Sequence, residues 1–312
     1  MKFYNKHNKK YDWKNRKLKI TILVSSIVVG IVVGGTLLTQ KFSKNKEVLK
    51  AVASDSSPTQ NQDNKTEKNY GPIDKSSDNE VENVEYLEKY IAEQEKGQKP
   101  EGADGKKVAY LTFDDGPSET VTPQILDILK SENVHATFFL VGKNMDKNEA
   151  SKNLVKREVE EGNAIGIHSY SHDYNYLFPK EKINIENCMT DFNKTDDSLK
   201  KILGEKFSTR ALRFPGGQET WSKKDPQGAD SVDKALHEKD WHQIDWNCLS
   251  GDAEGKVKNA GELTEYAIKT IGKREKALVL MHDTYGKEET AKALPGIIQY
   301  LKQQGYEFKI IK

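Results

Sequence analysis

Two neighbouring acids and two histidines carry most of the chemical information in this sequence. Asp114 and Asp115 lie in the run Thr-Phe-Asp-Asp-Gly-Pro, and His168 and His172 lie in the run His-Ser-Tyr-Ser-His. Because side chains on an extended backbone alternate sides, the two acids are expected to take opposite faces and separate tasks. Histidines four residues apart lie on one face of a helical turn and can bind one ion. Asp115, His168 and His172 are therefore predicted to bind a metal ion, with one coordination position left for water.

Each pattern also has an ordinary structural explanation. An Asp-Asp-Gly-Pro run is made of turn-forming residues, so in isolation it indicates a turn as readily as a site. Two histidines at helical spacing are often a coincidence on a protein surface. Their joint occurrence, each directly after an apolar run, favours the site.

Strand-like and helix-like segments alternate from about Lys107 to the C-terminus. Short apolar runs predict strands, and longer runs with helical apolar spacing predict helices. The alternation predicts parallel strands joined by crossover helices, hence an α/β barrel or a doubly wound sheet. The predicted strands are 108–113, 136–141, 164–167, 211–214, 241–247, 277–281 and 308–311, and the predicted helices are 123–131, 150–161, 182–203, 232–238, 260–271 and 294–304.

Both folds gather their chemistry at the carboxyl ends of the strands. The candidate residues were selected by residue type, and their positions at strand ends are an independent check. Those that follow or end a predicted strand are Asp114, Asp115, His168, Arg213, Asp252 and His282.

The net charge and the cysteine count limit the classes of function that this protein can have. There are 49 basic and 48 acidic residues, so the net charge of +1 gives no electrostatic case for nucleic-acid binding. The only cysteines, Cys188 and Cys248, could pair in an exported protein, but two isolated buried thiols are an equal alternative.

The N-terminal region predicts a membrane anchor. Residues 1–19 form a basic tail, and residues 20–39 are uncharged and apolar over the roughly 20 residues that a spanning helix needs. The basic side should stay in the cytoplasm, which places the rest of the chain outside. A cleaved signal peptide is the competing interpretation, because Ala51-Val52-Ala53 resembles a cleavage site, but the apolar run is longer than a signal peptide requires. A soluble product in the medium that begins near Ser54 would favour cleavage.

Residues 40–105 are predicted to form an extracellular stalk. Ser54 to Asn83 contains too few apolar residues to fold alone and is predicted to be largely disordered. The segment 84–96 has apolar residues at helical spacing and predicts a short helix, which either packs on the next domain or extends the stalk. Residues 106–312 remain for the folded domain.

That domain resembles the NodB-homology domain of polysaccharide deacetylases, carbohydrate esterase family 4. Residues 112–117 match the first family motif without change, and residues 168–172 match the second, His-Ser-x-x-His. Arg-Phe-Pro-Gly-Gly at 213–217 fits the third motif, and Leu-Val-Leu-Met-His at 278–282 fits the last. Four motifs in the right order over roughly two-thirds of the chain make the resemblance highly specific.

The fourth motif departs from the family pattern. Family members commonly have Asp-Trp there, whereas Ala253 follows Asp252 in this chain, so a tryptophan wall of the pocket is missing. This departure leaves the substrate specificity open. The residues expected to line the pocket instead are Pro215, Trp221, Trp246 and Leu280.

The resemblance also implies a fold, a reaction and a place of action. The expected fold is α/β, a distorted (β/α) barrel of the NodB type. The expected reaction is metal-dependent removal of N-acetyl groups from a cell-wall glycan at the outer face of a Gram-positive-type membrane, by a monomer. Zn²⁺ is the expected metal, with Co²⁺, Ni²⁺ or Mn²⁺ as alternatives. Peptidoglycan N-acetylglucosamine is the leading substrate; N-acetylmuramic acid, a wall-linked polysaccharide and an inactive glycan-binding module remain alternatives.

Each remaining site residue receives a role in that reaction. Asp114 is expected to accept the proton of the attacking water, and Arg213 to hold Asp114 in place. His282 is expected to protonate the leaving amine, with Asp252 orienting its ring. The backbone N–H of Gly216 is expected to bind the oxyanion; many family members have Tyr at this position, but the backbone N–H is retained.

Overall fold

A computed structural model describes residues 80–312 of the protein. The predicted basic tail, the apolar run 20–39 and the stalk up to residue 79 lie outside the described residues. Within residues 80–312, no helix is both long and apolar enough to cross a membrane.

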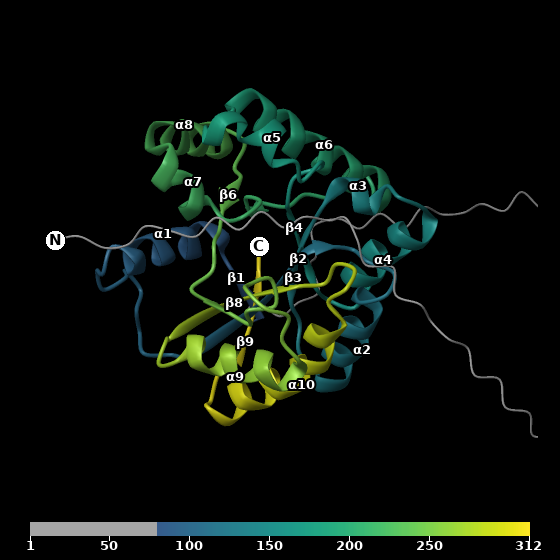
Figure 1. The fold of residues 1–312 in the computed structure, drawn as a ribbon, viewed down its shortest axis with the longest axis vertical. Coiled ribbons are helices and arrows are strands. Elements are labelled where there is room, and N and C mark those ends of the chain that lie inside the picture. Colours follow the sequence, from purple (N-terminus) through teal and green to yellow (C-terminus); the bar gives the residue numbers. More distant parts are fainter. Residues whose placement is uncertain (1–79) are drawn as a thin grey trace, which may run out of the picture. The chain divides into compact units, whose positions relative to one another are not determined.

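The core of the fold is an eight-stranded sheet in which every pairing is parallel. The strand order is β6-β5-β4-β3-β2-β8-β7, and β9 pairs with the start of β2 (Figure 1). The predicted parallel α/β architecture is therefore confirmed, as a curled sheet that is open between β6 and β7. The strands are β2 (Val108–Gly116), β3 (Thr137–Leu140), β4 (Ala164–Ile167), β5 (Ala211–Leu212), β6 (His242–Gln243), β7 (Cys248–Leu249), β8 (Lys276–His282) and β9 (Glu307–Phe308).

The long crossover helices cover one face of this sheet and contact one another in the order α9-α10-α2-α4-α6-α8, which follows the strand order (Figure 1). Shorter helices lie in the connections at the carboxyl ends of the strands. The long helices are α2 (Thr122–Glu132), α4 (Glu149–Glu160), α6 (Ile185–Leu203), α8 (Pro226–His237), α9 (Ala260–Ile271) and α10 (Glu288–Gln303), and the short ones are α3 (Gly142–Met145), α5 (Tyr174–Leu177), η2 (Pro179–Glu181) and α7 (Gln218–Lys224).

Local sequence signals explain where several helices begin. Asn148, Asn184 and Asn259 precede α4, α6 and α9, and each side chain accepts a hydrogen bond from a backbone N–H of the first turn. Glu262 accepts in return from the backbone N–H of Asn259, which completes a capping box.

Strand β2 shows how the sheet separates core from site. Leu111 and Phe113 face the covering helices, whereas Tyr110 faces the inner, concave side, as the two-residue period of a strand requires. The inner positions that follow Tyr110 are Thr112 and Asp114. His168, Arg213 and His282 lie on the inner side at the ends of β4, β5 and β8. The residue before each of them, Ile167, Leu212 and Met281, faces the helices.

Helix α1 (Val84–Glu95) packs on the folded domain. Val84, Leu87, Tyr90 and Ile91 are buried in the inner-face cluster that also contains Tyr110. Strand β1 (Val81–Glu82) pairs with β10 (Ile310–Ile311), which fixes the start of the helix. Of the two alternatives for this segment, the structure shows packing on the domain.

The single strand predicted over 241–247 is wrong. Ile244 N–H donates to Leu212 O at 2.8 Å, on the β5 side, whereas Asn247 N–H donates to Leu278 O at 3.3 Å, on the β8 side. The chain thus changes partner at Asp245 and Trp246 and spans the opening of the sheet. An apolar pattern reports burial but not which neighbour a backbone pairs with, so the sequence could not show this change.

The two cysteines are free and buried. Cys188 lies in α6 and Cys248 begins β7, so the structure shows two isolated thiols and no disulfide between them.

Replacement of Leu87 by Ala tests whether α1 unfolds together with the domain. Leu87 is fully buried, so the free energy of unfolding should fall by about 2–5 kcal/mol in chemical denaturation. Lys89→Ala, on the exposed face of the same helix, removes only a surface ion pair with Glu101 and should cost less than about 1 kcal/mol. Equal effects of the two substitutions would contradict the inferred packing.

Candidate active site

The two neighbouring acids lie on the same side of the site. Asp114 Oδ2 and Asp115 Oδ1 are 3.8 and 3.4 Å from Nε2 of His168. The pairing of β2 with β3 shifts register between Asp114 and Gly116, and Asp115 has a positive φ of 70°. The expectation that the acids take opposite faces is therefore wrong. A bulge with a left-handed residue breaks the strand alternation and turns Asp115 toward the histidines.

The two histidines also converge by a different route from the one expected. Residues 168–172 form no helical turn; the loop bends through Ser169 and His172, whose φ values are 67° and 50°. Asp191 of α6 fixes the loop by accepting from Tyr170 N–H at 2.7 Å and Ser171 N–H at 3.0 Å. The predicted helical turn is wrong, and a loop held by a distant carboxylate takes its place.

Asp115, His168 and His172 nevertheless form a group with the donor atoms that a divalent metal requires. The two Nε2 atoms lie 3.4 and 3.1 Å from Asp115 Oδ1, and that buried oxygen has no hydrogen-bond partner. Nδ1–H of His168 donates to Arg213 O at 2.8 Å, which leaves its Nε2 as a lone pair directed at Asp115. The three residues fit a cation, because an orphaned carboxylate oxygen and a correctly oriented imidazole lone pair meet at one point.

The electrostatics favour the ionised carboxylate. Burial alone would raise the pKa of Asp115, but hydrogen bonding and positive charge from His168 and His172, when their rings are protonated, outweigh burial and lower the pKa below its ordinary value. An ionised carboxylate is the form that binds a metal.

Asp114 is held by a buried arginine. Arg213 NH1 donates to Asp114 Oδ1 and to Thr112 Oγ1, both at 2.8 Å. The guanidinium has no exposed surface, and its remaining donors reach the carbonyl oxygens of Ile244 at 2.8 Å and Asp245 at 3.3 Å. Arg213 thus links β2 to the segment that follows β6, and these contacts fix the position of the Asp114 carboxylate.

His282 and Asp252 form the second charged pair. Nδ1 of His282 lies 2.8 Å from Asp252 Oδ1, and Asp252 Oδ2 accepts from the His282 backbone N–H and from Thr290 Oγ1, each at 2.8 Å. Burial lowers the pKa of His282, but the hydrogen bond and charge of Asp252, aided by Asp114 and Asp115, raise it to about 9. The raised pKa favours the protonated ring, and Nε2 is the ring nitrogen left for another partner.

Comparison with known proteins decides the family. A sequence model described as polysaccharide deacetylase matches residues 101–234. A peptidoglycan-N-acetylglucosamine deacetylase of Bacillus cereus is 32% identical over 211 residues, which are 65% of this chain and 69% of that protein. The chain belongs to the polysaccharide deacetylase family. The resemblance drawn from the four motifs is thereby confirmed.

Two further comparisons show how much of this polysaccharide deacetylase chain is similar to known relatives. The peptidoglycan-N-acetylglucosamine deacetylase PgdA of Listeria monocytogenes is 32% identical over 213 residues, 68% of this chain, but the match spans only 39% of that protein. A carbohydrate esterase family 4 esterase of Streptococcus mutans has a similar structure, with a TM-score of 0.66 and 33% identity over 75% of this chain and 93% of the other.

The residues expected to line the pocket of this deacetylase-family domain differ in exposure. Pro215 and Trp221 are buried: Trp221 Nε1 donates to Pro215 O at 2.8 Å, and its ring stacks on Phe178 at 3.8 Å. Leu280 is almost fully buried two residues before His282. Trp246 is partly exposed at the sheet opening, 5.6 Å from the Arg213 guanidinium.

Tyr174 is a site residue that the sequence did not indicate. Its ring meets His172 edge-on at 5.4 Å, and 43% of the residue is exposed. Its hydroxyl lies 3.1 Å from the point where a Cβ of Gly216 would be, so Tyr174 fills space that a side chain at position 216 would need. A groove of about 700 Å³ beside His172 is lined by Tyr170, Tyr174 and Lys194, among others. Tyr174 follows the second motif closely, but only the folded loop places it against Gly216.

Asp283 is a second residue that the motifs missed. It is fully buried beside Gly116, where a Cβ would come within 2.2 Å of its Oδ2. Burial, with the charges of Asp115 and Asp114, raises the pKa of Asp283 to about 7, although a hydrogen bond from Thr122 acts in the opposite direction. The only sequence signal is its position directly after His282.

The protonation of His282 provides a test of the site electrostatics. Its pKa is raised from 6.5, so the stabilisation from its protonation is complete below pH 6.5 and is lost as pH rises through about 9. Asp252→Asn removes the paired anion and should lower the pKa of His282 by about 1–3 units, as NMR titration of metal-free protein would show. Asp127→Asn, on the exposed face of α2, should leave this pKa unchanged. An unshifted pKa in Asp252→Asn would contradict the assignment.

Proposed function

We propose that the protein is a metal-dependent hydrolase that removes N-acetyl groups from amino sugars of a cell-wall glycan. One observation supports the proposal: the group Asp115, His168 and His172, which could hold a metal ion, lies with the Asp114–Arg213 and Asp252–His282 pairs at the carboxyl ends of one parallel sheet. The products are acetate and a glycan with a free amine.

Asp115, His168 and His172 would hold the metal. When bound, it would supply a water of lowered pKa, from 15.7 toward roughly 7, and a Lewis acid for the acetyl carbonyl. Two imidazoles and one carboxylate favour Zn²⁺, with Co²⁺, Ni²⁺ and Mn²⁺ as alternatives.

Asp114 would accept the proton of the attacking water. Arg213 occupies Oδ1 of Asp114, so Oδ2 is the oxygen that faces the histidines, 3.8 Å from Nε2 of His168. A base must lie within hydrogen-bond reach of the proton that it takes, and Oδ2 borders the ligand group. Arg213 would act through Asp114, by holding it.

His282 would deliver a proton to the leaving nitrogen. Asp252 holds the ring through Nδ1 and keeps it protonated, so Nε2–H can donate to the amine as the C–N bond breaks. The backbone N–H of Gly216 would stabilise the oxyanion that develops on the acetyl carbonyl. Loss of one such donor costs on the order of 3 kcal/mol in other hydrolases.

Peptidoglycan N-acetylglucosamine is the substrate that we favour. The names of the Bacillus and Listeria relatives support it, and the predicted membrane anchor and stalk would place the domain beside the wall. Exposed tyrosines at the groove, Tyr174 and Tyr176, offer apolar faces with polar tips to a polymer. N-acetylmuramic acid or a wall-linked polysaccharide remains the alternative, because Ala253 removes the tryptophan common at this position.

Two substitutions separate metal binding from proton transfer. Asp114→Asn should lower acetate release by at least about 10²-fold while the bound metal, measured by atomic emission, stays at the wild-type level. His168→Ala should lose both metal and turnover, since it removes a ligand. Asp127→Asn serves as the surface control and should change neither. An Asp114→Asn protein with near wild-type turnover would refute the role of Asp114.

The substrate is tested with the full-length protein on peptidoglycan and, separately, on an acetylated chitooligosaccharide. We expect acetate release from peptidoglycan, abolished by a chelator and restored by Zn²⁺, with mass spectrometry of wall fragments locating the free amine on glucosamine. Release that resists the chelator would contradict metal dependence. Glycan binding without release, in a protein that holds its metal, would favour the inactive binding module.

A further inference from the structure

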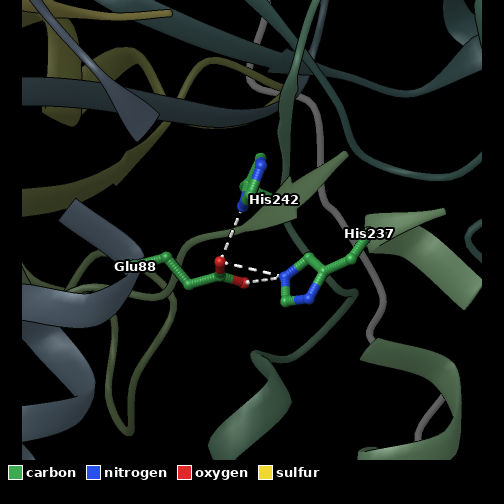
Figure 2. Close-up of side chains that lie close together, drawn as sticks. All are labelled: Glu88, His237 and His242. Atoms are coloured by element: carbon green, nitrogen blue, oxygen red, sulfur yellow. Dashed lines mark hydrogen bonds and ion pairs between the residues drawn. The ribbon is translucent and has the colours of Figure 1, made fainter. Parts of the chain in front are cut away.

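A second group of one carboxylate and two imidazoles lies at the side of the domain where α1 packs. Glu88 of α1 projects between His237, at the end of α8, and His242, in β6 (Figure 2). Glu88 Oε2 is 3.1 Å from His237 Nε2 and 2.8 Å from His242 Nδ1. The three segments are far apart in sequence, so only the folded chain brings these donors together.

This group repeats the composition and spacing of the active-site group. In both, one carboxylate and two imidazole nitrogens lie within 4.8 Å of one another. The carboxylate-to-imidazole distances are 2.8 and 3.1 Å around Glu88, against 3.1 and 3.4 Å around Asp115. Within residues 80–312, no other groups of this kind occur.

We propose that Glu88, His237 and His242 form a second metal site, which binds Zn²⁺ and fastens α1 to α8 and β6. Two imidazoles and a carboxylate are ligands that Zn²⁺ prefers, and three protein ligands leave a position for water. The side chains of Glu88 and His242 are mostly buried, with 17% and 9% exposed, whereas 47% of His237 is exposed and leaves a path for the ion.

The surroundings determine what binding requires of His242. Without metal, Arg210 donates to Nε2 of His242 at 3.1 Å, and Nδ1–H of that ring donates to Glu88. Coordination through Nδ1 moves the ring proton to Nε2, where Asp240 Oδ1, 3.4 Å away, can accept it. The ring stays neutral, and a carboxylate then supports the ligand from behind, as is usual for zinc-bound histidine. Arg210 would then give up its contact with the ring, and its two hydrogen bonds to Asp240 are available to hold the guanidinium beside the site.

The charge around the group suits a cation. Glu85 and Asp240 lie beside it and share the single guanidinium of Arg210. Burial, and to a smaller extent the negative charge of Glu88, raise the pKa of Asp233 in α8 to about 6. A divalent ion would neutralise carboxylates that one arginine leaves in excess.

The site would stabilise the position of α1 because one ligand comes from that helix and two from the domain. α1 already packs through its apolar face. A metal adds a second attachment on its polar face, at the point where the chain enters the domain from the region before residue 80. This role is structural and is independent of the proposed deacetylase activity.

Metal counting in a background without active-site ligands tests the proposal. In full-length protein carrying His168→Ala and His172→Ala, we expect about one Zn²⁺ per chain by dialysis and atomic emission, from the remaining three-ligand group. Adding Glu88→Gln, which keeps a hydrogen-bond acceptor but removes the charge, should weaken Zn²⁺ binding at least about tenfold. His237→Ala should do the same, and because His237 is half exposed the fold should tolerate it.

His135→Ala is the matched control. His135 Nδ1 also lies near a carboxylate, 3.7 Å from Glu80 Oε2, at 37% exposure, but it belongs to neither three-ligand group. Zn²⁺ should slow amide hydrogen exchange in residues 84–95 of the background protein and of its His135→Ala form, but not of the Glu88→Gln form. Absence of bound Zn²⁺ in the background, or equal losses in His135→Ala and His237→Ala, would overturn the site. Zn²⁺-independent protection of α1 would show that the group is only a hydrogen-bonded contact.

Discussion

The buried guanidinium of Arg213 is the constraint on which the site depends. An arginine without solvent exposure costs several kcal/mol of desolvation unless acceptors surround it. The acceptors are Asp114 in β2 and the backbone carbonyl groups of Ile244 and Asp245, which follow β6. Thr112, which accepts from Arg213, donates in turn to Val279 O of β8 at 2.9 Å. The need to satisfy one charge therefore ties β2, which carries Asp114, to β8, which carries His282, and to the segment that follows β6.

Around this fixed centre, irregular backbone places the three side chains that we propose as metal ligands, Asp115, His168 and His172. Asp115, Ser169 and His172 all have positive φ, a conformation that costs most non-glycine residues free energy. The regular strands place Asp114 and His282, the residues that we propose for proton transfer, at inner positions. The bulge at Asp115 and the loop that ends at His172 then bring these two side chains within 3.1 Å of each other. Regular strands therefore position the proposed proton-transfer residues, and irregular backbone positions the proposed metal ligands.

The carboxylates of the site differ in whether they have a cationic partner. The site contains the carboxyl groups of Asp114, Asp115, Asp252 and Asp283, and burial raises the pKa of Asp283 to about 7. Asp114 and Asp252 each have a cationic partner of their own. Asp115 has only two imidazoles at distances that leave its Oδ1 without a hydrogen bond. A divalent ion at this point would balance the remaining charge and explain why a buried oxygen lacks a donor.

The sequence by itself determined the parallel α/β class, the polysaccharide deacetylase family and the strand ends that carry Asp114, His168, Arg213 and His282. It could do so because apolar periodicity and strand-end placement are local properties. Only the tertiary structure decided that Asp115 turns to the side of Asp114, that the segment 241–247 changes sheet partner, and that Tyr174 meets Gly216. These depend on register, on left-handed backbone and on contacts between distant segments, which residue spacing does not encode. For the same reason the sequence could not predict that Glu88 contacts His237 and His242, because these residues lie in three elements that the folded chain brings together.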